Sequence, residues 1–489
     1  MKIKHNVITL LMCLFLLNSY SQVKQENPLR PNIIIMLADD LGYDDLSCYR
    51  NQNDIQSENA PSSQTPFIDN LAKEGMCFTN FYSGAAVCSP SRAALLTGRN
   101  ATRLGIYNFI APGVPMHLEN EEITIAELLK QKKYATAHFG KWHLTSENTN
   151  QPQPLDQGFD YAFWTYNTSK PSHKNPVNYI KNRDDVGELK GYSSHLVVGE
   201  AINWLEKNKA NKTPFYMNIW FNEPHEKVAA PDSLKIRHKN NKDYYGCIEN
   251  MDYAVGKLMK YLKENELDEN TIIIYTSDNG SKYEGSNIPL RGEKCFQYEG
   301  GIRVPFIAFW KGMFPAGIKS DVVGNFTDVL PTLASLTKTQ VRQDRTIDGE
   351  NLSNVLLGKT KEYQRKEPIF FYRYFHDPIC MLREGNMVLL GYQEKPKPWQ
   401  VNYNAAEEAL FQPNEGEPKG SQWRFQKNHM DAINIQEPRY FELYNVETDL
   451  RQHTNIALGN AVLLDKMKKM MLKKREEMVE EGGNWYKTN

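Results

Sequence analysis

Two short groups of oxygen-bearing side chains each follow an apolar run. Asp39 and Asp40 come directly after the apolar residues 33–38, and Asp278 and Asn279 close a second apolar run at 271–276. If both runs are strands of a covered parallel sheet, their carboxyl ends meet at the edge where ligands collect. Adjacent carboxylates repel each other unless a cation lies between them, and an all-oxygen set suits Ca²⁺ or Mg²⁺. Each group taken alone is better explained as a loop cap or a turn.

A cysteine lies where a loop leads into a predicted helix. The string Cys-Ser-Pro-Ser-Arg occupies residues 88–92 and is followed by the helix formers Ala-Ala-Leu-Leu. Proline is favoured at the start of a helix, so Cys88 is expected near the positive end of the helix dipole, where anions are favoured. Arg92 adds a fixed cation one turn later. An isolated cysteine in such a place is normally a small buried apolar residue, so its function depends on the rest of the sequence.

The full set of motifs resembles the formylglycine-dependent (type I) sulfatases of the alkaline-phosphatase superfamily, and bacterial polysaccharide sulfatases most of all. Residues 88–92 match the C-x-P-x-R core of that family, and the match extends through Thr-Gly-Arg at 97–99. Further matches follow in the order of the family and cover nearly all of the chain after residue 21. They are Asp-Asp at 39–40, Gly-Lys-Trp-His-Leu at 140–144, Asn-Glu-Pro-His at 222–225, Ser-Asp-Asn-Gly at 277–280, the lysine-bearing loop at 290–305 and a closing segment at 442–455.

This resemblance implies a role for each matching residue. Cys88 would be oxidised to formylglycine (3-oxoalanine), whose hydrated aldehyde attacks sulfur to give a covalent sulfo-enzyme. A Ca²⁺ ion, with Mg²⁺ as the second choice, would lower the pKa of the attacking hydroxyl. The implied metal ligands are Asp39, Asp40, Cys88, Asp278 and Asn279. The other implied catalytic residues are the cations Arg92, Lys141 and Lys294, the base His143 and the acid His225. Taken singly, these histidines and lysines would be ordinary structural or solvated side chains.

The resemblance also suggests the substrate and a second partner. Bacterial members of the family mostly remove sulfate esters from polysaccharide fragments. We therefore expect a sulfated oligo- or polysaccharide of algal type, ulvan or carrageenan, with animal glycosaminoglycans as the alternative. Polar and aromatic side chains between the motifs could stack on sugars or hydrogen-bond them. The candidates are Glu223, Arg237, His173, His376 and Trp399. A formylglycine-generating maturation enzyme is the other expected partner.

Two further classes of function stay open. A phosphodiesterase or phosphonate hydrolase of the same superfamily would share the fold and the metal. A carbohydrate-binding protein without catalysis would keep the fold and leave Cys88 unmodified, although the intact ligand set and both histidines argue against it.

The elements that must position these residues alternate along the chain. Buried strands are predicted at 33–38, 134–139, 215–221, 271–276 and 304–310. Helices are predicted to open at Thr65-Pro66 and at the capping box of residues 124–127, and to cover 195–209, 243–266 and 327–336. This alternation predicts an α/β fold of alkaline-phosphatase type, with a large, mostly parallel central sheet and helices on both faces.

The pattern changes after about residue 365. Short strands are predicted at 369–374, 379–383, 387–392 and 440–444, with a long loop over 394–434 and a charged helix over 461–481. We therefore expect a catalytic domain over residues 22–365. A smaller C-terminal domain over 366–489, with a short antiparallel sheet and a helix, would complete the substrate pocket.

Composition sets limits on the partners. The chain has 489 residues, with 40% hydrophobic and 24% charged residues and a formal net charge of −1. This balance provides no basic field for nucleic acid or an anionic membrane, so an anionic substrate must be held by local charge. The seven cysteines are scattered, without a Cys-x-x-Cys pair, and indicate neither a zinc site nor a dense disulfide framework.

The N-terminus predicts export. Lys2, Lys4 and His5 precede an apolar run over 7–17, and small residues stand at the positions required for cleavage after Ser21. This is the layout of a secretory signal peptide over residues 1–21, and its apolar run is too short to span a bilayer. The mature protein is expected to be periplasmic or secreted, without stable membrane insertion.

Overall fold

The computed structural model describes residues 30–50, 62–147, 149–211, 213–396 and 424–487. The predicted signal peptide and Trp399 lie outside these residues. None of the helices in the described part of the chain combines the length and the apolar character that a membrane crossing requires.

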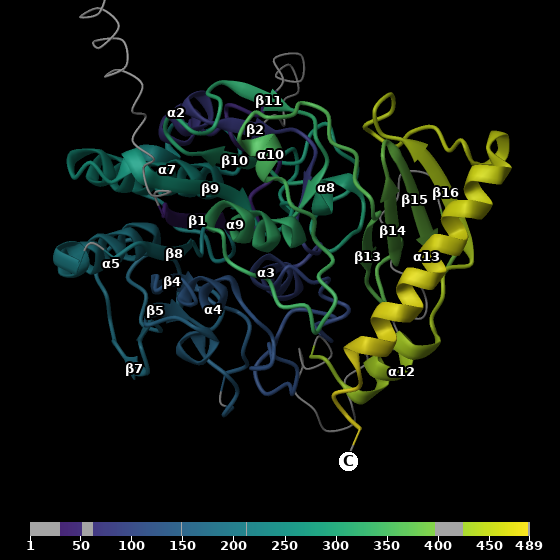
Figure 1. The fold of residues 1–489 in the computed structure, drawn as a ribbon, viewed down its shortest axis with the longest axis horizontal. Helices are drawn as coiled ribbons and strands as arrows, with labels where there is room; N and C mark the ends of the chain where they lie inside the picture. Colours follow the sequence, from purple (N-terminus) through teal and green to yellow (C-terminus); the bar gives the residue numbers. More distant parts are fainter. Residues whose placement is uncertain (1–29, 51–61, 148, 212, 397–423, 488–489) are drawn as a thin grey trace, which may run out of the picture.

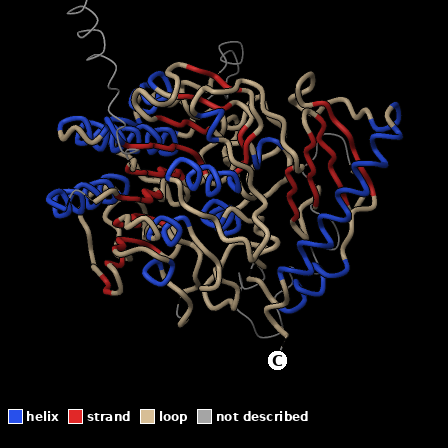
Figure 2. Tube along the Cα trace, viewed as in Figure 1, coloured by secondary structure: helices blue, strands red, loops and turns tan. Residues whose placement is uncertain are grey.

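A ten-stranded mixed sheet forms the centre of the larger part of the molecule (Figures 1 and 2). Its strands lie in the order β11-β2-β10-β9-β1-β8-β4-β5-β6-β7. Their bounds are β1 Asn32–Ala38, β2 Met76–Phe78, β4 Ala135–Lys141, β5 Tyr161–Thr165, β6 Ile180–Lys181, β7 Asp184–Asp185, β8 Phe215–Trp220, β9 Thr271–Ser277, β10 Phe306–Phe309 and β11 Ile318–Ser320. The five central strands, from β9 to β5, are parallel, whereas β10 runs antiparallel to β9. The predicted parallel centre is confirmed, and the run at 304–310 contributes an antiparallel strand.

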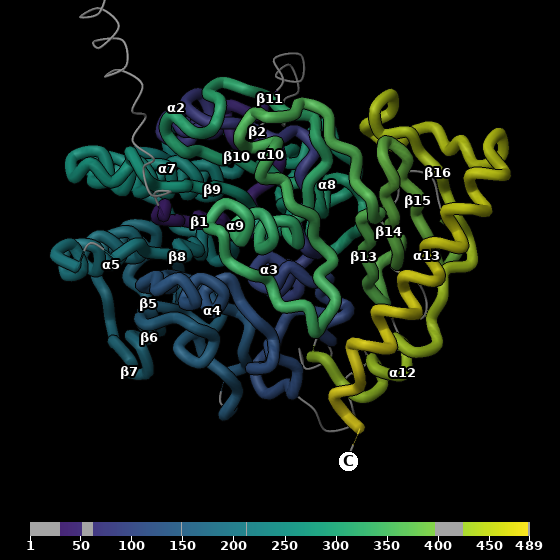
Figure 3. The backbone as a smooth tube through the Cα atoms, in the orientation of Figure 1, coloured from purple at the N-terminus to yellow at the C-terminus, as the bar shows by residue number. Residues whose placement is uncertain are grey.

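Helices cover both faces of this sheet (Figure 3). Alternate residues of β1 point to opposite sides, so Ile33 and Ile35 join one apolar core while Ile34 and Met36 join the other. On the Ile33 side lie α3 Cys88–Thr97, α4 Ile125–Lys130 and α9 Val329–Thr337, and on the Ile34 side lie α2 Pro66–Glu74, α5 Ser193–Asn208 and α7 Lys242–Glu264. Shorter helices are α6 Asp232–Lys235, α8 Glu299–Ile302 and α10 Ser353–Leu356, and a small two-stranded sheet pairs β3 Phe81–Tyr82 with β12 Gly324–Asn325.

Local sequence signals place several helix starts. Pro66 is the first residue of α2, as predicted. The capping box before α4 is complete, because the Thr124 side chain accepts from the Glu127 N–H and the Glu127 carboxylate accepts from the Thr124 N–H at 2.9 Å. These two donors are among those that a helix start leaves without partners, so the sequence determines the helix boundary.

The C-terminal part forms a second sheet beside the large one (Figure 1). Its four antiparallel strands are β13 Ile369–Tyr372, β14 Cys380–Glu384, β15 Met387–Tyr392 and β16 Tyr440–Asn445. One face packs under α13 Ala461–Gly482 through Phe370, Leu382 and Met471. The other face, with Phe371 and Met381, packs against residues of the large unit. The predicted small sheet and helix are therefore confirmed, whereas the division of the chain into domains at residue 365 stays a prediction.

One loop prediction is wrong in part. Within the segment 394–434 that was expected to be a loop, helix α12 begins at Lys427 and continues to Ile435. His429, Met430 and Ile433 are buried in this helix, and Met430 and Ile433 pack in the main core. Their spacing of three to four residues is helical, but the polar flanks conceal it.

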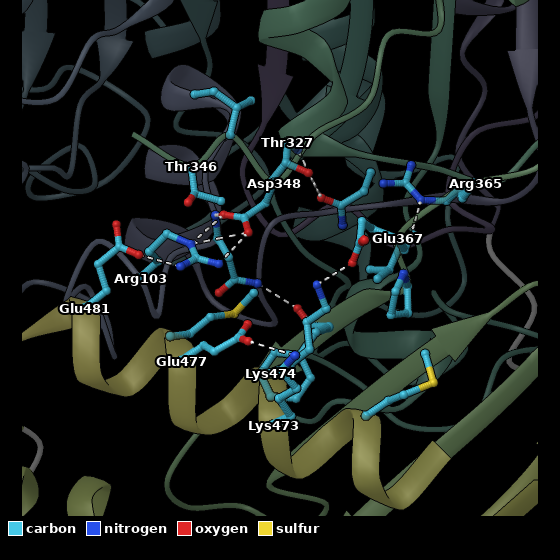
Figure 4. A pocket seen from close by; sticks show the side chains of 18 of the residues that line it. Arg103, Thr327, Thr346, Asp348, Arg365, Glu367, Lys473, Lys474, Glu477 and Glu481 are labelled. Atoms are coloured by element: carbon cyan, nitrogen blue, oxygen red, sulfur yellow. Dashed lines mark hydrogen bonds and ion pairs between the residues drawn. The ribbon is translucent and has the colours of Figure 1, made fainter. Parts of the chain in front are cut away.

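A cavity of about 890 Å³ separates α13 from the large unit (Figure 4). Arg103 pairs with Asp348 and Glu481, and Lys474 pairs with Glu367 at 2.6 Å. These cations are thus matched by carboxylates, and the pair between Arg103 and Glu481 fastens α13 to the large unit. The cavity is lined by residues other than those that the sequence motifs single out.

Candidate active site

The two oxygen-bearing groups meet at the carboxyl edge of the sheet. Strands β1 and β9 are parallel neighbours in which Ala38 pairs with Ser277, so the residues that follow them lie side by side. The N–H of Asp40 donates to an oxygen of Asp278 at 3.1 Å, and the Asn279 amide donates to Asp40 at 2.7 Å. The four predicted oxygen ligands, Asp39, Asp40, Asp278 and Asn279, are at most 1% exposed.

Cys88 is the first residue of α3 and is 3% exposed. Every residue of α3 is buried, and Gly98 ends it in a left-handed conformation. Burial raises the pKa of the Cys88 thiol to about 11, although the ammonium groups of Lys141 and Lys294 oppose the rise. An unmodified thiol at this place is therefore protonated at neutral pH and is a poor nucleophile.

A group of donor atoms around Cys88 could hold a metal ion. One donor atom each from Asp39, Asp40, Cys88 and His225 lie within 4.8 Å of one another. Among the described residues, no hydrogen bond reaches the buried Oδ1 atoms of Asp39 and Asn279, although Arg92 lies 3.4 Å from that of Asp39. Buried oxygens without donors are costly unless a cation satisfies them, so these residues fit a hard divalent ion.

The arrangement differs from the implied ligand set in one respect. Both oxygens of Asp278 have partners, because Oδ2 accepts from Arg92 and Oδ1 accepts from the Asp40 N–H. His225 approaches instead, with its Nε2 atom 3.6 Å from Oδ2 of Asp40. The ion pair with Arg92 therefore occupies the side of Asp278 that faces α3.

Three buried cations surround the carboxylates. Arg92 donates twice to Asp278, at 2.9 and 2.7 Å, and once to the Lys141 carbonyl. The Lys141 ammonium lies 2.7 Å from Asp39, and the Lys294 ammonium contacts Asp40. Burial alone would raise the pKa of Asp40, but Lys294, His225 and Lys141 outweigh it and hold that pKa below its usual value. The site thus places three cations around carboxylates at the start of α3.

A close backbone approach positions the lysine-bearing loop. The Gly280 N–H donates to the Gly301 carbonyl at 3.0 Å, and the Lys294 N–H donates to the Ser281 carbonyl at 3.2 Å. A Cβ atom on Gly280 would lie 1.8 Å from the Gly300 carbonyl oxygen, so only glycine fits there. The glycine after Asn279 therefore brings Lys294 next to the carboxylates.

The two histidines have different hydrogen-bond partners. Nε2 of His143 lies 3.1 Å from the Ile110 carbonyl and must donate to it, which leaves Nδ1 as an acceptor without a partner. Burial and the charges of Lys141 and Arg92 lower the pKa of His143 well below its usual value, so it is neutral. In His225 the other ring nitrogen, Nδ1, is the donor, and it donates to the Glu226 carbonyl at 2.7 Å. Burial, followed by the charge of Lys294, lowers the pKa of His225 to about 3.

Two predicted sugar contacts, His173 and Glu223, are buried and have hydrogen-bond partners within the protein. His173 is fully buried and reaches the His225 carbonyl with Nε2 at 2.5 Å. Glu223 is 1% exposed and accepts from the Ser193 hydroxyl and the Ser194 N–H at the start of α5. Both hold the loop that carries His225, and their contact with a sugar stays a prediction.

The other predicted sugar contacts are dispersed. Arg237 is half exposed and pairs with Glu249 of α7 at 3.2 Å. His376 is 4% exposed and stacks on Phe296, two residues after Lys294, with ring centroids 5.0 Å apart. Trp399 lies outside the described residues. Of the two that the structure describes, His376 lies next to the lysine-bearing loop.

Some residues of the site carry no signal in the sequence. The Ile110 carbonyl orients His143, and Ser193 links Glu223 to His173 at 2.5 and 3.2 Å. Both act through a backbone or hydroxyl group that any sequence offers many times. Arg373 reaches the same region from the small sheet, and its place depends on how the two sheets pack.

Comparison with known proteins assigns the family. The model of the family described as sulfatase matches residues 31–339, more than half of the chain. N-acetylgalactosamine-6-sulfatase of Canis lupus familiaris is 34% identical over 382 residues, which cover 71% of this chain and 69% of that one. Arylsulfatase of Hemicentrotus pulcherrimus is 31% identical over 392 residues, covering 73% and 66%. The match thus spans about two thirds of the length of these relatives. The chain belongs to the sulfatase family, a family of sulfuric ester hydrolases.

Solved structures share the architecture over almost the whole chain. The crystal structure of Ps i-CgsB superposes with a TM-score of 0.74 at 26% identity and covers 94% of both chains. The structure of Ps i-CgsB in complex with k-i-k-neocarrahexaose matches with the same TM-score and coverage at 25% identity. Phosphonate monoester hydrolase of Agrobacterium radiobacter, at 18% identity and a TM-score of 0.61, shares the fold alone. The predicted alkaline-phosphatase-like α/β fold is thereby confirmed.

Proposed function

We propose that this chain hydrolyses sulfate esters of a sulfated glycan through a formylglycine made from Cys88. The observation that carries the proposal is the position of Cys88. It begins α3 within one compact group of donor atoms with Asp39, Asp40 and His225. Because its thiol has a raised pKa, a plain cysteine would be inert there, whereas an aldehyde hydrate supplies a hydroxyl nucleophile.

The side chains support a two-step reaction. In the first step, one hydroxyl of the hydrated residue 88 would lose its proton to solvent and its oxygen would bond to sulfur, while the bond between sulfur and the sugar oxygen breaks. His225, protonated once the sulfate is bound, would give its proton to that sugar oxygen. In the second step, His143 takes the proton of the remaining hydroxyl, the carbonyl reforms and sulfate leaves. The free acceptor Nδ1 of His143 suits this second role. A bound sulfate would raise the pKa of His225, since a nearby anion favours its protonated form.

The cations supply electrostatic stabilisation around the transferring group. Arg92 and Lys141 are fully buried and fixed by carboxylates, so they need no reorganisation during the reaction. Lys294 is held by Asp40 in the same way. A divalent ion, for which we propose Ca²⁺, would lower the pKa of the attacking hydroxyl and draw charge from the sulfate oxygens. Asp39, Asp40, Asp278 and Asn279 would hold it, and Asp278 is also paired with Arg92.

The substrate class follows from the relatives. We propose a sulfated polysaccharide or its oligosaccharides of algal type, of which carrageenan is supported by the complex of Ps i-CgsB with k-i-k-neocarrahexaose. Ulvan is retained from the sequence resemblance. The relative named N-acetylgalactosamine-6-sulfatase supports a glycosaminoglycan as the alternative. We further propose export through residues 1–21 and modification of Cys88 by a formylglycine-generating enzyme.

Mass spectrometry and turnover on one preparation test the proposal. We expect the peptide over residues 83–92 to carry formylglycine and the protein to hydrolyse aryl sulfate faster than aryl phosphate. Cys88→Ala should abolish turnover without loss of the fold, measured by circular dichroism. Active protein with an unmodified cysteine would refute the mechanism. A preference for phosphate would favour a phosphoester or phosphonate hydrolase, and modified protein inactive on a panel of sulfated oligosaccharides and aryl esters would favour a binding protein.

A further inference from the structure

Arg373 leaves the small sheet directly after β13 and reaches two loops of the large unit. Its Nη1 donates to the Cys295 carbonyl at 2.5 Å, and its Nη2 donates to the Asn108 side chain at 3.2 Å. The guanidinium also lies over the Phe375 ring at 4.0 Å and beside Nδ1 of His376 at 3.2 Å. The side chain is therefore held in one orientation by partners that carry no negative charge.

The guanidinium of Arg373 is a buried cation without a counter-ion among the described residues. Arg373 is 5% exposed, its Nε atom has no hydrogen-bond acceptor, and no carboxylate of the described residues lies within 4.0 Å of it. The other site cations, Arg92, Lys141 and Lys294, each contact a carboxylate. A buried charge that is neither paired nor fully hydrogen-bonded is costly, so such a position favours an anionic ligand.

The contacts of Arg373 place it at the border of the active site. Cys295 directly follows Lys294, and its N–H donates to the Ala86 carbonyl, two residues before Cys88. Asn108 lies two residues before Ile110, whose carbonyl orients His143. Arg373 thus joins the loop of the lysine to the loop that holds the proposed base. A sugar whose sulfate ester lies at Cys88 must present its other substituents to these loops.

We propose that Arg373 binds a second anionic group of the substrate, a sulfate or a uronate carboxylate, on the ring that carries the reacting ester or on its neighbour. The inference rests on the proposed function, because it takes the sulfate site at Cys88 as its reference point. A guanidinium offers a planar fork of donors that matches both anions, and the buried Nε–H has no acceptor among the described residues. Arg373 then selects multiply charged glycans over singly charged ones.

The competing explanation is purely structural. Arg373 could simply fasten the small sheet to the large unit, as Arg383 does. Arg383, on β14, is 2% exposed, and its guanidinium also lies over an aromatic ring, that of Tyr82. Its Nε, however, donates to the Gly385 carbonyl at 2.8 Å and its Nη1 donates to the Tyr82 hydroxyl. Arg383 is therefore the matched control for a buried arginine whose Nε is already satisfied.

Calorimetric binding to Cys88→Ala protein separates the two explanations without relying on turnover. One pair of probes is galactose 6-sulfate and galactose 2,6-disulfate. The other is the unsaturated chondroitin disaccharide 6-sulfate and its carboxylate methyl ester. We expect one pair to show the doubly anionic probe binding about 10- to 100-fold more tightly, as charge-assisted hydrogen bonds do. Arg373→Gln should remove most of this ratio, while Arg383→Gln should retain it.

The outcomes distinguish failure of the inference from failure of the proposed function. Equal ratios in Arg373→Gln and in its parent, or the absence of a preference in both pairs, would overturn the inference. The pair that shows the preference tells sulfate from carboxylate. If Arg373→Gln fails to fold, Arg373→Lys takes its place. This variant keeps the charge but loses the planar fork of donors, and it should retain only part of the affinity ratio. Lack of turnover of both aryl sulfate and the panel of sulfated oligosaccharides by formylglycine-bearing wild-type protein would instead refute the proposed function.

Discussion

The ion pair between Arg92 and Asp278 offers a quantitative test of the site. Both side chains are fully buried, and Arg92 donates to one oxygen of Asp278 at 2.9 and 2.7 Å. Replacing Arg92 by Met keeps an unbranched apolar side chain but removes the guanidinium that lies over Trp220. Asp278 then lies next to Asp39 and Asp40 without this cation. Burial and these two carboxylates then oppose its ionised form.

The expected loss of stability is about 3–5 kcal/mol, which is typical of breaking a buried ion pair from one side. For the roughly 310 residues of the family match, unfolding entropy is about 0.65 kcal/mol per degree, so the melting temperature should fall by about 5–8 °C. The double variant Arg92→Met, Asp278→Asn removes both charges and should recover at least about half of the loss. Arg183→Met, which breaks an exposed pair with Asp156, should cost at most about 1 kcal/mol.

Thermal unfolding in excess EDTA measures these differences without a contribution from a bound cation. The loss in Arg92→Met should be larger at pH 8 than at pH 5, because an unpaired buried carboxyl takes up a proton in the folded state more readily than in the unfolded state. A single variant that melts within 1 °C of wild type, or a double variant less stable than the single one, would contradict the electrostatic account.

Three other predictions test separate features. Asp278→Ala should abolish both turnover and the rise in melting temperature that Ca²⁺ gives the wild type; retention of both would refute the metal assignment. His225→Asn should slow sulfate esters of alcohols more than those of acidic phenols, since a phenolate needs no proton to leave; equal losses would exclude the acid role. Burial raises the pKa of Asp252 to about 7, although the hydrogen bonds that its carboxylate accepts from the N–H groups of Ile68 and Phe67 oppose the rise. The folded state therefore binds a proton more tightly than the unfolded state does, and the free energy of unfolding should fall as pH rises from about 4 to 7. Unfolding midpoints measured against pH would reveal this slope, and Asp252→Asn should remove it.

Local sequence patterns determined most of the fold. The apolar runs of β1, β8 and β9 lie where periodicity places them, because a strand covered on both faces needs unbroken apolar residues. The capping box at Thr124 and the proline at position 66 determined two helix starts, because they provide or remove backbone donors at those residues. The sequence pattern did not predict helix α12, because only three apolar residues of this helix are buried and they lie within a polar segment.

The sequence alone also determined the list of residues with candidate roles, since type and order along the chain carry the family resemblance. Only the tertiary structure decided how these residues pair. The register of β1 against β9 brings Asp40 to Asp278, residues far apart in the chain. Packing of the small sheet decided that Arg373 enters the site region without a carboxylate partner in the described part of the chain, and packing also decided that Glu223 and His173 hold the loop of His225. Such contacts depend on distances between elements, and a linear pattern of residue types does not specify those distances.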